Sequence, residues 1–157
     1  MVKKQSIETP KILNRKSKYD YFLFDRYEAG VQLLGAEVKS IREARVNMGD
    51  SYVKIIRGEV FLINCHISLY SKIQGYQDID PLRTRKLLLN RKEINVISKQ
   101  TERQGYAIIP TCMYFKKGRV KIEIALAKGK KQADKRESIK RRIDKRESDA
   151  EIKRHSK

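Results

Sequence analysis

The chain has 157 residues, about the size of one ordinary domain, and its 37 Lys and Arg against 19 Asp and Glu give a formal net charge of +18 at pH 7. An excess of this size indicates a polyanionic partner, and the charge alone does not choose between a nucleic acid and an anionic membrane surface. The chain has no run of about 18 apolar residues and its N-terminus lacks the apolar stretch of a signal peptide, so we expect a cytoplasmic protein that does not use membranes.

The first predicted elements are a strand and a short helix. The segment YDYFLFDRY (19–27) is rich in aromatic residues, which favours a strand. In AEVKSIREAR (36–45) the two large aliphatic residues lie three positions apart, while Lys39 and Arg42 share another face. This spacing predicts a short helix with a cationic outer side, and the turn residues at 47–50 end it.

A hairpin, a loop and a second helix are predicted next. The segment SYVKIIRGEVFLINCHISLY (51–70) has the pattern of two strands joined at RGE. Mixed polarity with Gly and Pro predicts a loop at 71–85. The five residues KLLLN (86–90) fit either a buried strand or the first turn of a helix. In RKEINVISKQTER (91–103) the isoleucines lie three apart, which predicts a helix closed by Gly105.

The last ordered element that we predict is a second hairpin. The segments YAIIPTCMYF (106–115) and RVKIEIALA (119–127) flank KKG, and Pro110 indicates a sheet edge or a bulge. Cys65 and Cys112 lie in alternating apolar segments, so we expect buried, reduced thiols. With two histidines and no CxxC or HxxxH spacing, we expect no metal site and no cofactor.

About six short strands and two helices define the predicted fold class. Antiparallel hairpins in a chain this small usually close into a barrel, because closure removes exposed strand edges. We therefore expect a mainly β protein: a small closed antiparallel β-barrel of oligonucleotide-binding type with two or three short helices.

The basic ends complete the predicted organisation. Residues 1–18 carry six basic and one acidic side chain, net +5, and residues 128–157 carry 13 basic and six acidic, net +7. Three isoleucines in the last thirty residues bury too little surface to offset about 1–2 kcal/mol per residue of backbone ordering. We expect a flexible basic N-terminal arm (1–10), a β-barrel RNA-binding domain (11–128), and a basic tail (129–157) that is disordered when free and helical once an anion neutralises it.

Catalytic chemistry has little support in the sequence. Glu28, Glu37, Asp50 and Glu59 are the carboxylates that an RNA-cleaving metal site would use, but in a chain full of Lys and Arg they fit turns, caps and ion pairs better. His66 lies on an apolar strand and is interpreted as a core histidine. We therefore predict that the protein is not an enzyme.

RNA binding has more material. Lys39 and Arg42 share a helical face, "RTRK" places three basic residues within 83–86, and "NRK" occupies 14–16. Four tyrosines offer faces on which unpaired bases stack, although half-buried packing is the alternative for each: Tyr19, Tyr21, Tyr70 and Tyr76. A structural ribosomal protein with basic arms is a second interpretation of the same charge.

Five blocks, in order between about residues 11 and 142, resemble the SmpB family, the SsrA-binding proteins of bacterial trans-translation: "LNRK", "YEAGVQLLGAEVKSIR", "DSY", "RTRKLLLN" and "AKGKKQADKR". The resemblance implies an oligonucleotide-binding-like barrel, monomeric when free. It implies binding to the tRNA-like domain of transfer-messenger RNA and delivery to stalled 70S ribosomes and their ribosomal RNA. Alanyl-tRNA synthetase and elongation factor Tu would be indirect partners, and the tail would probe the empty messenger channel as a helix.

The motifs also assign residues. Together with the basic clusters above, they give the expected RNA contacts Asn14, Arg15, Lys16, Glu28, Lys39, Arg42, Arg85, Lys86, Leu88 and Lys121. Glu28 would accept hydrogen bonds from base amino or 2′-hydroxyl groups, or fix a neighbouring Arg; Leu88 would touch an unstacked base, or belong to the core. In the tail, where Gly129 is expected to act as a hinge, the ribosome-binding positions would be Gly129, Lys130, Lys131, Asp134, Lys135, Arg136 and, as a candidate, Ile152.

Overall fold

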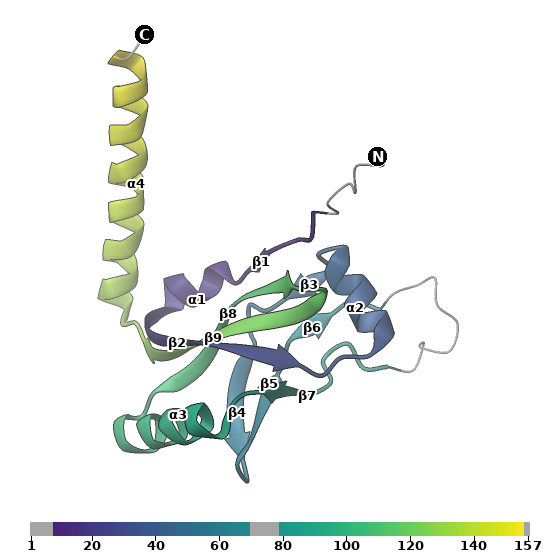
Figure 1. The fold of residues 1–157 in the computed structure, drawn as a ribbon. Coiled ribbons are helices and arrows are strands. Elements are labelled where there is room, and N and C mark those ends of the chain that lie inside the picture. The colour runs from purple at the N-terminus through teal and green to yellow at the C-terminus, as the bar shows by residue number, and fades with distance from the viewer. Residues whose placement is uncertain (1–7, 70–78, 156–157) are drawn as a thin grey trace, which may run out of the picture.

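The computed structural model describes residues 8–69 and 79–155, which form nine strands and four helices (Figure 1). The helices are α1 Arg15–Asp20, α2 Gly35–Arg42, α3 Arg91–Gln104 and α4 Gln132–His155. The strands are β1 Ile12–Leu13, β2 Tyr21–Val31, β3 Val46–Asn47, β4 Tyr52–Ile56, β5 Glu59–Ile63, β6 His66–Ile67, β7 Arg85–Leu88, β8 Ala107–Lys116 and β9 Arg119–Gly129.

Six strands pair in an antiparallel, near-closed ring in the order β8-β4-β5-β7-β2-β9, and β9 pairs back to β8. This ring confirms the predicted antiparallel, mainly β architecture. The contact between β4 and β8 is the narrowest seam, since the pair Val53 and Ile108 is the one register pair that joins them. Strand β1 pairs with β8 outside the ring, and β3 and β6 form a separate two-stranded sheet.

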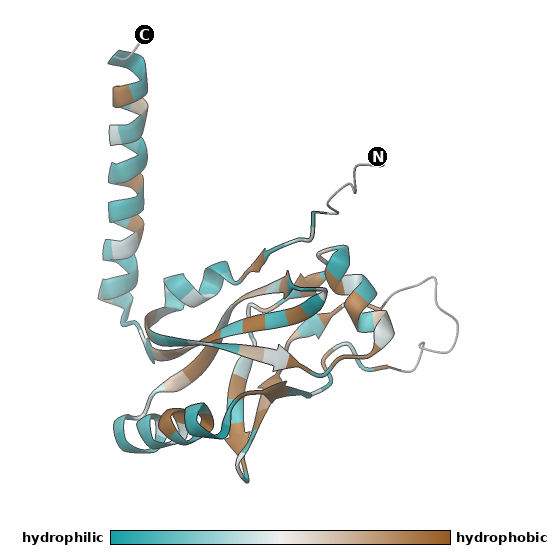
Figure 2. Ribbon diagram, viewed as in Figure 1, coloured by the Kyte–Doolittle hydropathy of each residue, from teal (hydrophilic) through white to brown (hydrophobic). Residues whose placement is uncertain are grey.

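The core fills the ring because alternate residues of each strand point inward. On β9, Val120, Ile122 and Ile124 are buried, and Figure 2 shows the alternating apolar and polar bands along this strand. Cys65 and Cys112 are buried free thiols, as predicted. Burial raises the pKa of the Cys65 thiol to about 11, so this thiol stays protonated.

Most elements follow the sequence prediction. Helices α2 and α3 form where expected, and Gly105 ends α3 in the left-handed conformation at φ 66°. Both hairpins form, and Pro110 lies at a register shift in the ladder between β8 and β9. The ambiguous segment 86–90 supplies most of strand β7. Residues 1–7 of the expected N-terminal arm, residue 70 at the end of the first expected hairpin and residues 71–78 of the expected loop lie outside the described residues.

The tail departs from the prediction. We expected residues 129–157 to be disordered when free, whereas Gln132–His155 form a 24-residue helix that stands away from the ring (Figure 1). At 1.5 Å per residue this helix is about 36 Å long. None of its residues is buried, and Figure 2 shows a largely hydrophilic surface on it. Its length exceeds the roughly 12–15 residues below which an isolated helix is marginal, and Lys, Arg, Glu and Ala all favour helix.

Contacts with α1 and the start of β2 hold the base of α4. The backbone N–H of Lys130 donates to the Asp20 carbonyl at 2.8 Å, and the Lys135 ammonium lies 3.3 Å from the Asp20 carboxylate. Lys135 and Arg142 both lie over the Tyr19 ring. Within the helix, the Asp134 carboxylate caps the first turn by accepting from the Lys131 N–H at 3.2 Å. These contacts, like the helix itself, contradict the expectation that the tail is disordered when free.

The carboxylate of Asp20 gives a direct test of this docking. Asp20→Asn removes the charge that pairs with Lys135 and keeps the backbone carbonyl that accepts from Lys130. We expect faster amide exchange over the first turns of α4 and unchanged exchange in the ring, because an ion pair that remains partly exposed contributes about 0.2–1 kcal/mol. Asp144→Asn, on an exposed part of the same helix, is the matched control. Equal exchange in both variants would contradict the docking.

Across residues 8–69 and 79–155, no helix combines the length and apolar character that a membrane span needs.

Candidate RNA interface

Three strands bring two of the expected contact residues, Leu88 and Lys121, into one row with Gly30 on the outside of the ring. Gly30 on β2 lies between its ladder partners Leu88 on β7 and Lys121 on β9. A side chain at Gly30 would crowd Leu88, since an added Cβ would lie 3.3 Å from the Leu88 Cβ. Leu88 is 49% exposed, which excludes the alternative that it belongs to the core. The missing side chain at Gly30 therefore leaves an apolar residue accessible beside a lysine.

Glu28 lies two residues before Gly30, on the same side of β2. Its carboxylate accepts a hydrogen bond from the Tyr114 hydroxyl and one from the Lys116 ammonium at 3.2 Å. The hydrogen bond from Tyr114, with the one from Lys116, lowers the pKa of Glu28. Burial and the neighbouring Glu28 raise the pKa of Tyr114. Glu28 is therefore an anion held in a fixed direction, and its partners are a tyrosine and a lysine rather than an arginine.

These residues surround a shallow hollow of about 440 Å³. The hollow is lined by Glu28, Gly30, Leu88, Leu89, Asn90, Glu93 and Lys121. It offers a fixed carboxylate acceptor, an amide, an apolar surface and an ammonium group within one small region. Such a combination suits an unstacked base next to its phosphate better than it suits a regular duplex, whose backbone presents only phosphates and sugars.

The "RTRK" cluster divides between two sides of the sheet. Lys86 and Leu88 point outward, and Lys86 pairs with Glu59 at 3.1 Å. Arg85 points inward and is fully buried; it pairs with Glu37 and donates to the Cys65 carbonyl at 2.6 Å. A direct RNA contact by Arg85 does not fit this burial, and the expectation for this residue is corrected. The residue is a structural anchor instead.

Glu37 joins helix α2 to strand β7. Its buried carboxylate accepts from Arg83, from Arg85 and from the Leu34 N–H. Burial alone would raise the pKa of Glu37, but hydrogen bonds from Arg83, the Leu34 N–H and Arg85 outweigh it, so that the pKa is lowered. The interaction sets the position of α2, which carries Lys39 and Arg42 on its exposed side. The Arg42 guanidinium lies 5.8 Å from the centre of the Phe115 ring.

The "NRK" cluster at residues 14–16 also divides, into one buried and two exposed residues. Asn14 is buried, and its side-chain amide donates to the Pro110 carbonyl at 2.7 Å and to the Met48 carbonyl at 3.2 Å. It fastens the turn before α1 to the ring, which is a structural role. Arg15 and Lys16 are exposed, and Lys16 pairs with Asp50 at 2.7 Å.

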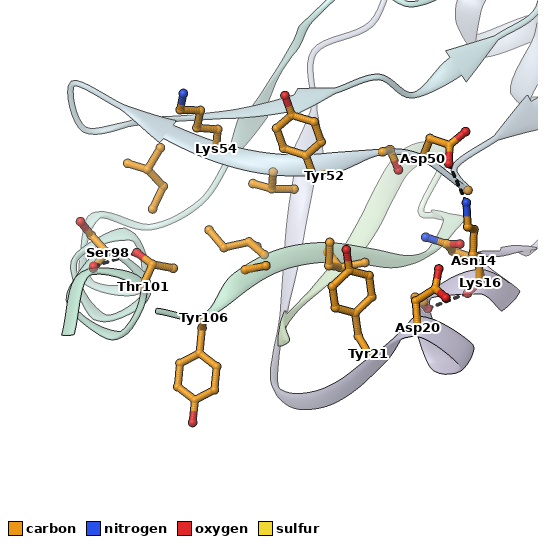
Figure 3. A pocket seen from close by; sticks show the side chains of 18 of the residues that line it. Asn14, Lys16, Asp20, Tyr21, Asp50, Tyr52, Lys54, Ser98, Thr101 and Tyr106 are labelled. Atoms are coloured by element: carbon orange, nitrogen blue, oxygen red, sulfur yellow. Dashed lines mark hydrogen bonds and ion pairs between the residues drawn. The ribbon is translucent and has the colours of Figure 1, made fainter. Parts of the chain in front are cut away.

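A larger groove of about 580 Å³ lies beside α1 and was not predicted (Figure 3). Side chains from α1, β4, α3 and β8 line it, next to the narrow seam between β4 and β8. Tyr21 lies in this groove, whereas Tyr19 packs under α4. Tyr70 and Tyr76, the other two expected stacking residues, lie outside the described residues. The groove was not predicted because it depends on the incomplete pairing of β4 with β8, which the sequence pattern does not reveal.

The tail residues fall into two groups. Lys130 and Lys135 contact α1 and β2, whereas Lys131, Arg136 and Ile152 are exposed, Ile152 by 67%. Asp134 lies in the first turn of α4. Gly129 pairs with Tyr21 in the strand ladder and has room for a side chain, so nothing in its conformation demands glycine or favours a hinge.

The structure also places the candidate catalytic carboxylates and His66. Each of the four candidate catalytic carboxylates has its own basic partner: Glu28 has Lys116, Glu37 has Arg83 and Arg85, Asp50 has Lys16, and Glu59 has Lys86. No group of three His, Cys, Asp or Glu that could hold a metal ion occurs in the described part of the chain. His66 is exposed on β6, so its interpretation as a core histidine is wrong.

Comparison with known proteins gives one consistent family. The model of the SmpB protein family matches residues 11–154. The SsrA-binding protein of Caldanaerobacter subterraneus is 52% identical over 140 residues, covering 89% of this chain and 88% of that protein. The SsrA-binding protein of Geobacillus kaustophilus is 53% identical over 134 residues, covering 85% of this chain and 86% of that protein.

A solved structure gives the same result for the fold. A chain described under "tmRNA-SmpB: a journey to the center of the bacterial ribosome" is 36% identical, with a TM-score of 0.67, covering 83% of this chain and 95% of that one. The family match extends over all six strands of the ring and all but the last residue of α4. The chain therefore belongs to the SmpB family.

Proposed function

We propose that this protein binds the tRNA-like domain of transfer-messenger RNA and delivers that RNA to stalled ribosomes for trans-translation, without being an enzyme itself. The row Leu88, Gly30 and Lys121 beside Glu28 is the observation that carries the proposal. Family membership, relatives named SsrA-binding proteins and a related chain from a tmRNA-SmpB structure support it. In this proposal the ring acts as an oligonucleotide-binding-type barrel, and the free protein is a monomer.

Each group of the hollow has a distinct task in this proposal. The fixed carboxylate of Glu28 accepts hydrogen bonds from base amino or 2′-hydroxyl groups, and it contributes selectivity because it repels phosphate. Leu88 contacts the face of an unstacked base. Lys121 and Lys86 on the outer face of the ring, with Lys39 and Arg42 on α2, neutralise phosphates and contribute affinity.

Helix α4 has the second task. We propose that it enters the empty messenger channel of a stalled ribosome, where the exposed Lys131 and Arg136 contact ribosomal RNA phosphates. Because the helix is already formed, its entry does not require the ordering of a flexible tail. Alanyl-tRNA synthetase and elongation factor Tu would act on the same RNA, and a role at the ribosome implies a cytoplasmic location.

The carboxylate of Glu28 provides the test. Glu28→Gln keeps the shape of the side chain and removes the charge, and we expect it to weaken binding to the isolated tRNA-like domain by about tenfold, since hydrogen bonds to a charged group contribute about 1.5–3 kcal/mol. Filter binding at several salt concentrations measures the effect. If about six phosphates are neutralised, the logarithm of the association constant should fall with the logarithm of salt concentration at a slope near −5 for both proteins.

Glu102→Gln, an exposed carboxylate on α3, is the matched control and should bind as the wild type does. Two results would end the proposal: equal affinities for wild type and Glu28→Gln, or no preference of the wild type for the tRNA-like domain over a duplex of equal length at physiological salt.

A further inference from the structure

The first half of β2 exposes two large aromatic side chains. Phe22 is 46% exposed and Phe24 is 45% exposed. Neither belongs to the core or packs against it. A register shift between Leu23 and Arg26 contains Phe24 and precedes the half of β2 that carries Glu28. Phe22 and Phe24 therefore form a surface distinct from the hollow at Leu88.

Neighbouring strands extend this surface. Phe22 pairs with Lys128 on β9, and Ala127 pairs with Ala107 on β8, which brings Tyr106 next to Lys128. The Phe24 and Tyr106 ring centres are 5.1 Å apart with an angle of 57° between the planes. Figure 3 shows the Tyr106 ring pointing away from Tyr52 and Lys54. We refer to Phe22, Phe24 and Tyr106 as the aromatic row.

Two lysines lie over the aromatic row. The Lys128 ammonium is 4.8 Å from the centre of the Tyr106 ring, and the Lys130 ammonium is 5.2 Å from the centre of the Phe22 ring. Lys128 is exposed. An ammonium over a ring at a solvent-accessible site is held by about 0.5–1 kcal/mol, so Lys128 is available to a stronger anionic partner even though the Tyr106 ring beneath it is half-buried and packs against the core. Lys130 is held more firmly, because its ammonium also donates to the Lys18 carbonyl at 3.0 Å and to the Ser138 hydroxyl at 3.1 Å. The surface thus offers aromatic faces and positive charge side by side.

We propose that the aromatic row, together with Lys128 and Lys130, is a second RNA-binding surface that stacks unpaired bases of single-stranded RNA. Bases of any sequence present a face for stacking, and the phosphates between them suit the two ammonium groups. An apolar protein partner would instead strip water from two charges without replacing it, which disfavours that occupant. The proposal extends the proposed function, since it concerns unpaired RNA rather than the folded tRNA-like domain.

The position of the aromatic row fits this role. Lys130 contacts Phe22 and also donates to the Lys18 carbonyl at 3.0 Å, at the point where β9 leads into α4. A single strand stacked on the row therefore continues toward the basic surface of α4. None of the residues of the aromatic row, nor Lys128 or Lys130, lines the hollow at Leu88, so the two surfaces share no residue.

The test uses full-length protein and a fluorescein-labelled octauridylate, with binding followed by fluorescence anisotropy. We expect the double variant Phe24→Ala/Tyr106→Ala to lose about tenfold or more in affinity for the octauridylate, because a stacked base contributes about 1–3 kcal/mol. Phe24→Leu, which keeps an apolar side chain and removes the ring, should lose affinity in the same direction. Ile56→Ala, an equally exposed apolar residue at the first hairpin, is the control and should bind as the wild type does. Thermal melts identify a variant that has lost its fold, and Phe24→Leu then decides alone.

Two outcomes would overturn the inference. One is equal octauridylate affinity in the wild type and Phe24→Leu. The other is tighter binding of an octaglutamate peptide than of the octauridylate, with the same dependence on the aromatic row, which would assign the surface to an acidic protein.

Both variants should bind the tRNA-like domain within about twofold of the wild type, because they leave Glu28 and Leu88 unchanged. The two proposals can fail separately. If Glu28→Gln binds the tRNA-like domain as the wild type does, but octauridylate binding still depends on Phe24 and Tyr106, the proposed function is wrong and this inference stands.

Discussion

A chain that ends at Lys131 is expected to lose tagging of stalled nascent chains completely and to bind the tRNA-like domain within about threefold of full-length protein. The expected separation follows from the structure, since α4 begins at Gln132, has no buried residue and stands away from the ring. Its removal leaves the core and the hollow at Leu88 untouched. A reconstituted tagging assay on a truncated message, run in parallel with filter binding, measures both quantities.

A helix-breaking variant separates the shape of α4 from its charge. Ile139→Pro keeps every basic residue and costs about 3 kcal/mol or more of helix stability, because proline removes a backbone donor and clashes with the preceding turn. We expect tagging to fall strongly, whereas Ile139→Ala at the same position should tag normally. The proposal assigns RNA binding to the ring and tagging to α4. This assignment would be wrong if the chain that ends at Lys131 tagged at the full rate, or if it lost as much RNA affinity as Glu28→Gln.

The largest expected loss of stability comes from Glu37→Ala. Arg85 is fully buried, and without Glu37 its guanidinium would keep one charged group in the interior with no carboxylate partner. Breaking a buried pair from one side costs about 3–5 kcal/mol, which is a large part of the stability of a domain of this size. Urea unfolding followed by circular dichroism measures it. Glu59→Ala, which removes an exposed partner of Lys86, is the matched control and should cost less than about 1 kcal/mol.

The same carboxylate predicts a pH dependence. The pKa of Glu37 is lowered in the folded state, so its contribution is present above the unfolded pKa of about 4.3 and is lost as the pH falls through the folded pKa. We expect the wild type to lose stability below about pH 4, and Glu37→Gln to lose less over the same interval. Parallel pH profiles for the two proteins would contradict an ionised Glu37 as the partner of Arg85.

The elements that the sequence predicted correctly have a local signal. Turns at RGE and KKG between alternating segments specified both hairpins, and isoleucines three apart with a following glycine specified α3. Helix α1 lacked such a signal, because its six residues are mostly polar and its position depends on the distant contacts of Asn14 with Met48 and Pro110. Strand β7 was ambiguous because five residues do not establish a period.

The tail and Arg85 show two other limits. The prediction of a disordered tail considered only the buried apolar area and omitted helix propensity. It also omitted the contacts of Lys130 and Lys135 with Asp20, which lies more than a hundred residues earlier in the chain. In the sequence RKLL each face of the strand carries one basic residue and one leucine, so alternation did not determine whether Arg85 or Lys86 points inward. Tertiary contact with Glu37 decides it.

The candidate site depends on register, which the sequence does not contain. Glu28, Leu88 and Lys121 were assigned by resemblance to a family, and composition predicted only a basic RNA-binding protein. Their meeting at one hollow requires Gly30 to lie between Leu88 and Lys121 in the ladder. The aromatic row was missed for the same reason: Phe24 and Tyr106 are 82 positions apart, and the pairing of β2, β9 and β8 brings them together.

The attachment of α4 makes it a lever with its pivot at Tyr19 and Asp20. A tilt of about 10° at that pivot would move the far end of a rod about 36 Å long through about 6 Å, roughly the pitch of one helical turn. A small shift of the six-residue helix α1 would therefore change which nucleotides the C-terminal end of α4 reaches, while the position of the ring stays unchanged. In this arrangement α1 sets the direction of α4, and the sheet carries the proposed RNA-binding residues. Mutations in the two elements can therefore be selected independently.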